Sequence, residues 1–163
     1  MTRIIADISV SLDGFVTGPD PGPDNGLGTG GAALHTWAFS DDPDDRRLLR
    51  EGTARSGAVV LGRRLFDVVD GPGGWDDETG YGAREVGKPA FVVVTSSLPG
   101  SVRLSDLDWT FVTTGLADAL TLHLAPVVLG AGTPLFTGGA PRTLVQRSVT
   151  VTSTATHLTY DVV

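Results

Sequence analysis

The chain has 163 residues, a length that favours one domain with a core large enough to fold unaided. Its formal net charge of −7 argues against a general nucleic-acid-binding surface, and the absence of cysteine excludes disulfides, thiolate metal sites and a cysteine nucleophile. No apolar run approaches the roughly 18 residues that span a bilayer, and Asp7 interrupts the short apolar run at the N-terminus, so a signal-peptide pattern is lacking. We therefore expect a cytoplasmic protein without nucleic-acid or membrane partners.

Apolar runs separated by turn-forming residues predict strands alternating with helices. The predicted strands are residues 4–10, 58–61, 91–94, 109–112 and 120–129. Asp42-Pro43 supplies a possible N-cap and a first-turn proline for a helix that runs to Arg55, and a shorter helix is predicted over residues 65–69. In the C-terminal tail, apolar and polar residues alternate, and the alternation changes phase between Val151 and Leu158. This change of phase fits a hairpin turn or bulge near residues 153–156.

These elements predict an α/β fold with a mostly parallel central sheet, flanking helices and antiparallel strands at the C-terminus. Residues 18–31 are rich in glycine, proline and aspartate, which indicates a functional or mobile loop. Residues 32–39 add a short helical turn, in which Trp37 is expected to anchor the loop to the core.

Two predicted strands end in segments whose residues suit a phosphate group. The first is Gly62-Arg63-Arg64, with two guanidinium groups, and the second is Thr95-Ser96-Ser97, with hydroxyl donors. Ligands of open α/β sheets bind beyond the carboxyl ends of strands, and an arginine there can accept the 2′-phosphate of NADP. Alternatively, the arginines lie on a helix surface and pair with Asp67 or Asp70, and the second segment is an ordinary turn.

Four blocks of sequence occur in an order that resembles a known enzyme family. They are SVSLDGFV at residues 9–16, GAVVLGRRLFD at 57–67, VVVTSS at 92–97 and LHLAPVVLGAGTPLF at 122–136. This order is similar to that in the C-terminal reductase domain of the bifunctional riboflavin-biosynthesis deaminase-reductase and its stand-alone relatives. The similarity extends to about residue 138, and it implies a dihydrofolate-reductase-like fold that holds NADPH across the sheet.

The resemblance also implies roles for individual residues. It implies that the adenosine phosphates face Gly62, Arg63 and Arg64, with Thr95 and Ser96 beside them. Residues 9–16 would lie against the nicotinamide and the substrate. This gives a cofactor set of Gly62, Arg63, Arg64, Leu65, Thr95, Ser96 and Val16, and a substrate set of Ser9, Asp13 and His123.

The sequence departs from the family pattern at two places. Leu65 stands where relatives have threonine, so a hydroxyl is lost while the backbone N–H remains. After Gly115, relatives carry roughly a helix, a strand ending in a glycine pair and a second helix, which this sequence lacks. Either the unit has been lost or it is missing between residues 115 and 116 of the sequence. We expect a chain break or a non-bonded distance at Gly115–Leu116, within one dihydrofolate-reductase-like domain covering 1–163.

Single polar residues leave several interpretations open. Asp13 lies near the reacting end of the site in the family, but a turn aspartate that caps backbone amides fits equally well. His123 alternates with two leucines, so it faces solvent, a polar partner in the core, or the substrate cleft. His35 and His157 have no partners at metal-ligand spacing, and no metal site is predicted.

We expect an NADPH-dependent oxidoreductase that reduces a small heteroaromatic or carbonyl compound, similar to 5-amino-6-(5-phosphoribosylamino)uracil reductases. The resemblance suggests a pyrimidine or pteridine-like ring as substrate, and the proton donor is water or Asp13. The alternative is a non-catalytic small-molecule or nucleotide-binding protein on the same scaffold. A homodimer through residues 120–129 and the C-terminal hairpin is also expected, because two-fold dimers are the commonest closed assembly.

Overall fold

The computed structural model describes residues 3–76, 89–113, 118–137 and 141–163. The contacts divide the chain into two compact units, which we describe one at a time. The first unit comprises Met1–Pro21, Leu27–Arg46 and Leu116–Val163, and the second comprises Gly22–Gly26 and Arg47–Gly115. The expected break at Gly115–Leu116 falls within residues 114–117, outside the described residues.

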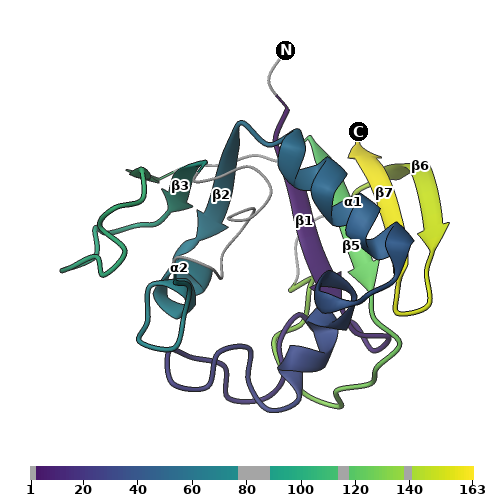
Figure 1. The fold of residues 1–163 in the computed structure, drawn as a ribbon, viewed down its shortest axis with the longest axis horizontal. Coiled ribbons are helices and arrows are strands. Elements are labelled where there is room, and N and C mark those ends of the chain that lie inside the picture. Colours follow the sequence, from purple (N-terminus) through teal and green to yellow (C-terminus); the bar gives the residue numbers. More distant parts are fainter. Residues whose placement is uncertain (1–2, 77–88, 114–117, 138–140) are drawn as a thin grey trace. The chain divides into compact units, whose positions relative to one another are not determined.

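The first unit contains a mixed sheet with the strand order β1-β5-β7-β6. Its strands are β1 (Ile5–Val10), β5 (Ala119–Leu124), β6 (Leu144–Val151) and β7 (Thr156–Val162). β1 and β5 are parallel, whereas β7 is antiparallel to both of its neighbours (Figure 1). The C-terminal antiparallel strands predicted from the sequence are therefore confirmed.

One face of this sheet carries a 3-10 helix, η1 (Gly31–Phe39), and the start of α1 (Pro43–Ala54). Leu34 and Trp37 of η1 are buried, so the tryptophan anchors this segment as predicted. The register places Ser9 beside His123 and His123 beside His157, so three polar side chains lie in a row across β1, β5 and β7.

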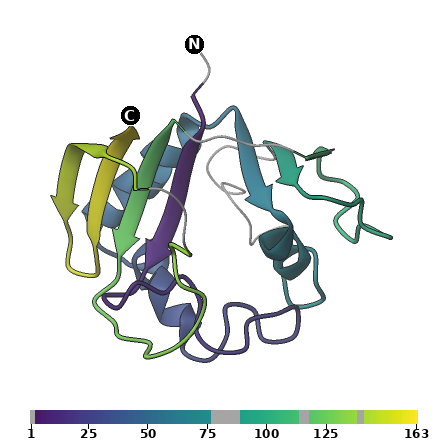
Figure 2. The same ribbon diagram turned by 180° about the vertical axis from the view of Figure 1, so that it is seen from behind.

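The second unit contains a three-stranded parallel sheet in the order β2-β3-β4. The elements are β2 (Ala58–Gly62), α2 (Arg63–Val69), β3 (Ala90–Val94) and β4 (Trp109–Val112) (Figure 2). Its buried core consists of apolar side chains from β2, α2 and β3, namely Val59, Leu61, Val69 and Phe91. The predicted α/β class with parallel strands is confirmed, and the described strands form two sheets.

Two details differ from the sequence-based expectations. The strand predicted over residues 120–129 ends at Leu124, because Pro126 has no N–H for a sheet ladder and the chain turns to contact the segment after β1. There, the N–H of Leu12 donates to the carbonyl of Val127 at 2.9 Å.

The second detail concerns the C-terminal hairpin. The predicted turn is present, since the N–H of Thr152 donates to the carbonyl of Ala155 at 2.9 Å. A separate irregularity lies within β6, where Gln146 and Ser148 pair with consecutive residues of β7 and Arg147 is extra. The turn therefore produces the change of phase in the alternation of apolar residues, and the bulge at Arg147 is a separate feature several residues earlier.

Candidate functional site

The carboxyl ends of β2, β3 and β4 lie next to one another in the second unit. The register pairs Gly62 with Val94 and Val94 with Val112, so the two segments predicted to suit phosphate meet at one edge of the sheet. A side chain built onto Gly62 would meet no atom within 4 Å, which means that the backbone there is open to close approach. Ligands of parallel α/β sheets bind at this kind of edge.

The two arginines at this edge differ in their surroundings. The Nε of Arg63 donates to Asp67 Oδ1 at 2.7 Å, and its Nη1 donates to the carbonyl of Ser97 at 3.0 Å. Arg63 therefore links the ends of β2 and β3, and it makes one of the ion pairs that the surface interpretation predicted. Arg64 is exposed and has no hydrogen bond or ion pair with the described residues.

The remaining predicted cofactor residues of this unit are also placed at the edge. The Thr95 hydroxyl is buried and donates to the carbonyl of Ser97 at 2.8 Å, so it shapes the turn that follows β3. Ser96 is exposed. Leu65 is exposed in the first turn of α2, a helix whose start has no side-chain cap. Arg64 and Ser96 thus present a cation and a hydroxyl group to solvent.

The other predicted cofactor residue, Val16, and the predicted substrate residues lie in the first unit. The N–H of Val16 donates to the carbonyl of Thr133 at 2.8 Å, and a bridge joins Phe15 to Pro134. The first and fourth sequence blocks, 9–16 and 122–136, are therefore neighbours in space. A side chain at Gly132 would lie 1.8 Å from the carbonyl oxygen of Thr17, which explains why glycine is required there.

Asp13 closes the turn between these segments. Its Oδ1 accepts a hydrogen bond from the N–H of Leu129 at 3.2 Å, and its Oδ2 accepts one from the N–H of Gly130 at 2.7 Å. The Ser11 hydroxyl and these amides hold the pKa of the Asp13 carboxyl below its ordinary value. This geometry matches the capping interpretation of a turn aspartate.

Ser9 and His123 are buried and have polar partners in the core. The Ser9 hydroxyl accepts a hydrogen bond from Trp37 Nε1 at 3.0 Å. His123 Nδ1 lies 2.6 Å from His157 Nδ1, and its Nε2 lies 2.8 Å from Asp7 Oδ1. Of the three environments considered for His123, the structure shows a polar partner in the core.

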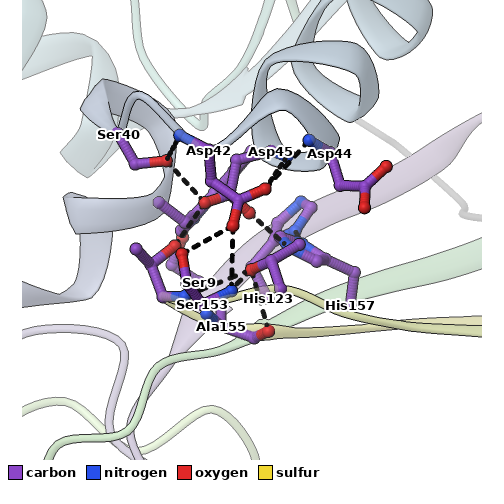
Figure 3. Close-up of polar contacts among 12 residues, drawn as sticks. Ser9, Ser40, Asp42, Asp44, Asp45, His123, Ser153, Ala155 and His157 are labelled. Atoms are coloured by element: carbon purple, nitrogen blue, oxygen red, sulfur yellow. Dashed lines mark hydrogen bonds and ion pairs between the residues drawn. The ribbon is translucent and has the colours of Figure 1, made fainter.

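Sequence reasoning missed the acidic residues that complete this cluster. Asp45 in the first turn of α1 is buried, and its Oδ1 lies 3.0 Å from His157 Nε2 (Figure 3). Its Oδ2 accepts hydrogen bonds from the hydroxyls of Ser40 and Thr154. Burial raises the pKa of Asp45, but these hydroxyls and His157 outweigh it and the pKa lies below its ordinary value. The sequence signal for Asp45 was its position near a helix N-terminus, which indicated helix stabilisation only.

Within the described part of the chain, no group of three or more histidine, aspartate or glutamate side chains is arranged to hold a metal ion. No helix there has the length and apolar character needed to cross a membrane.

Comparisons with known proteins give the fold. The structure superposes on a putative riboflavin biosynthesis protein from Shewanella sp. PV-4 with a TM-score of 0.61, 17% identity and 99% of both chains covered. It also superposes on Acinetobacter baumannii RibD with a TM-score of 0.62 and 14% identity. The chain has the fold of the riboflavin-biosynthesis reductases. This fold is the one that the four ordered sequence blocks predicted.

Two further comparisons qualify this likeness. The whole chain is covered in the match to RibD but spans 58% of that protein's length. A pyrimidine reductase-like protein from Corynebacterium diphtheriae shares the reductase fold with a TM-score of 0.51 and 13% identity over 99% of this chain. No protein-family model and no curated protein matches the sequence.

Proposed function

We propose that this chain is an NADPH-dependent reductase of a small heteroaromatic or carbonyl compound, with a pyrimidine or pteridine-like ring as the substrate class. The observation that carries the proposal is the edge of the β2-β3-β4 sheet, where Arg64 is exposed beside the Arg63 link between two strand ends. Support for the reductase class comes from the riboflavin-biosynthesis and pyrimidine reductase-like proteins that share the fold.

The donor groups at this edge fit a phosphorylated cofactor. Guanidinium groups bind phosphate through charge-assisted hydrogen bonds, and the exposed Ser96 hydroxyl adds a neutral donor. Gly62 leaves room for a phosphate to approach the backbone. Arg64, Arg63 and Ser96 would hold the adenosine phosphates, and the nicotinamide would supply the hydride.

The chain's net charge makes this local positive charge necessary. At −7, the protein as a whole repels an anionic cofactor, so attraction must come from a few nearby cations. Asp67 offsets part of the charge of Arg63, which leaves Arg64 as the stronger attractor. The proposal therefore assigns Arg64 the larger share of the discrimination between NADPH and NADH.

Titration of the full chain with NADPH and NADH tests the proposal. We expect NADPH to bind more tightly by roughly one to two decades, the amount that a charge-assisted phosphate contact contributes. The Arg63→Ala, Arg64→Ala double variant should bind the two cofactors alike. Arg50→Ala, which removes an exposed cation from α1, is the matched control and should retain the preference. Equal affinities in the parent chain would contradict the proposal.

Turnover is measured separately, by following NADPH oxidation with candidate pyrimidine and pteridine compounds. Oxidation that depends on the added compound supports a reductase. Tight and selective NADPH binding without oxidation by any compound of these classes would favour the alternative, a nucleotide-binding protein without catalysis.

A further inference from the structure

Four titratable side chains form a continuous chain through the first unit. Asp7 of β1 contacts His123 of β5, His123 contacts His157 of β7, and His157 contacts Asp45 of α1. The nitrogen-to-oxygen distances at the two ends are 2.8 and 3.0 Å, and the two Nδ1 atoms in the middle are 2.6 Å apart. Figure 3 shows the two rings meeting beneath the start of α1.

Counting protons along this chain gives its charge. A carboxylate only accepts hydrogen bonds, so the Nε2 atoms of His123 and His157 must each carry a hydrogen. Two Nδ1 atoms at 2.6 Å need one hydrogen between them, because two bare nitrogen lone pairs would repel and two N–H groups would collide. Four nitrogens therefore hold three protons, which makes one ring an imidazolium and the other a neutral imidazole.

The surroundings of the two rings differ in ways that decide which ring is charged. The indole of Trp37 is stacked on His123, with the ring centroids 3.9 Å apart and an interplanar angle of 22°, whereas it meets His157 edge-on at 5.2 Å. A cation is favoured over the face of an indole. Asp7, the partner of His123, is half exposed, while Asp45, the partner of His157, is already stabilised by hydroxyl donors.

These surroundings favour the charge on His123, and the directions of two pKa shifts agree with that assignment. Burial lowers the pKa of His157, although the hydrogen bond to Asp45 opposes this effect. Burial also lowers the pKa of His35, and the charge of His123 lowers it further. Both directions favour neutral rings at His157 and His35.

We infer that His123 and His157 form a proton-binding site that holds one shared proton, with His123 as the imidazolium and His157 as the neutral acceptor. Because the Asp7 side chain is the solvent-accessible end, with 49% of its surface exposed, the proton exchanges through Asp7. The titratable groups that face the pair are Asp7 from β1, His35 from η1 and Asp45 from α1. The residues of this site lie in the first unit, whereas those of the proposed cofactor edge lie in the second.

Side-chain nitrogen NMR of the full chain, labelled with nitrogen-15, tests the assignment directly. With His35→Gln and His157→Gln used to identify the three histidine spectra, we expect two protonated nitrogens on His123 near neutral pH. His157 should show a protonated Nε2 and a bare Nδ1. A neutral His123, a charged His157 or two neutral rings would overturn the inference.

A pair of aspartate variants tests the role of Asp7. Asp7→Asn should convert His123 to a neutral ring at the same pH, because the amide cannot stabilise the cation. Asp108→Asn removes an exposed carboxylate from the second unit and should leave the His123 spectrum unchanged. An imidazolium that persists in a folded Asp7→Asn chain would contradict the role of Asp7 in stabilising the charged His123.

A pH titration of the parent chain keeps the inference testable if Asp7→Asn does not fold. On raising the pH, the spectra of His123 and His157 should change together in one step, because a single proton is shared between them. Two separate steps would show independent rings and would overturn the shared site.

Discussion

Asp42 and Ser153, which lie 111 positions apart in the chain, are joined by two hydrogen bonds. The N–H of Ser153 donates to Asp42 Oδ2 at 3.1 Å and the Ser153 hydroxyl donates to the same oxygen at 2.5 Å. The other oxygen, Oδ1, accepts a bond from the N–H of Asp44 at 2.9 Å and so caps α1. One carboxylate thus fastens the start of a helix to the turn of the C-terminal hairpin (Figure 3).

Replacing Asp42 should weaken the helix start and the hairpin turn together. We expect Asp42→Ala to lower Tm by about 5 °C or more, because a helix cap and a long-range contact are lost in one change. Asp41→Ala removes an almost fully exposed carboxylate next to it and should lower Tm much less. Thermal unfolding followed by circular dichroism measures both, and equal losses would contradict the assigned role of Asp42.

Phe66 carries much of the packing in the second unit. Its side chain is 1% exposed and meets the rings of Trp109 and Phe111 edge-to-face, with centroids 5.1 and 5.4 Å apart. We expect Phe66→Ala to lower the free energy of unfolding by about 3–5 kcal/mol. Its neighbour Leu65 is 43% exposed, so Leu65→Ala should cost within about 0.5 kcal/mol. Urea unfolding of the two variants makes the comparison.

Acidification should destabilise the chain because of its buried histidines. The pKa values of His157 and His35 are lowered from 6.5 in the folded chain, so the unfolded chain binds more protons as the pH falls through about 6.5. The contribution of these two histidines to stability should therefore be fully present above this pH and decrease below it. Urea unfolding at about pH 7.5 and about pH 5 measures how the free energy of unfolding changes with pH.

Substitution of His157 shows whether this residue causes the dependence of stability on pH. His157→Gln should be less stable than the parent chain at both pH values, but its stability should depend less on pH between them. Asp42 has its pKa lowered to about 2 by hydrogen bonds from the side chain and backbone of Ser153, so its contribution to stability is lost only below about pH 3.8, outside this comparison. A parent chain that is equally stable at both pH values would refute the prediction.

Gly132 should tolerate no larger residue. It has φ +145°, and an added side chain would lie 1.8 Å from the carbonyl oxygen of Thr17. We expect Gly132→Ala to cost more than the roughly 1–3 kcal/mol of the backbone conformation alone. Gly100→Ala is the control, because a side chain there meets nothing within 4 Å. The free energies of unfolding of both variants test whether the close approach of the two segments is required.

The exposed valines of β6 bear on the homodimer expected from the sequence. Val149 and Val151 are 48% and 70% exposed, on a strand that forms one edge of its sheet. We propose that a second copy covers them, so light scattering should give about 34 kDa, twice the 16.9 kDa of one chain. Val149→Glu with Val151→Glu should give monomers, whereas Leu98→Glu, at another exposed apolar residue, should not. A monomeric parent chain at micromolar concentration would exclude this dimer.

The strands and helices could be predicted from the sequence because short apolar runs and turn residues bound them clearly. The α1 start at Asp42-Pro43 and the strands ending at Gly62 and Val94 lie where those patterns indicated. The end of β5 was placed too late, because the apolar residues after Pro126 pack in a loop instead of a ladder.

The edge with Arg63 and Arg64 was also predictable, since both segments directly follow strands that proved to be neighbours. The Asp7–His123–His157–Asp45 chain was not. Its members come from four elements, and their pairing depends on a register that joins β5 both to β1 and to β7. Alternation indicates which face a histidine occupies, but not which residues of distant segments share that face.

The bulge in β6 has a consequence for changes in chain length. Gln146 and Ser148 already pair with consecutive residues of β7, Tyr160 and Thr159, so a deletion of Arg147 would leave every partner in place. Only the ion pair of Arg147 with Asp161 would be lost. A deletion at Thr150, by contrast, would displace one part of the strand against β7 and turn its side chains to the opposite face. Within this strand, Arg147 is the position at which the protein can become one residue shorter.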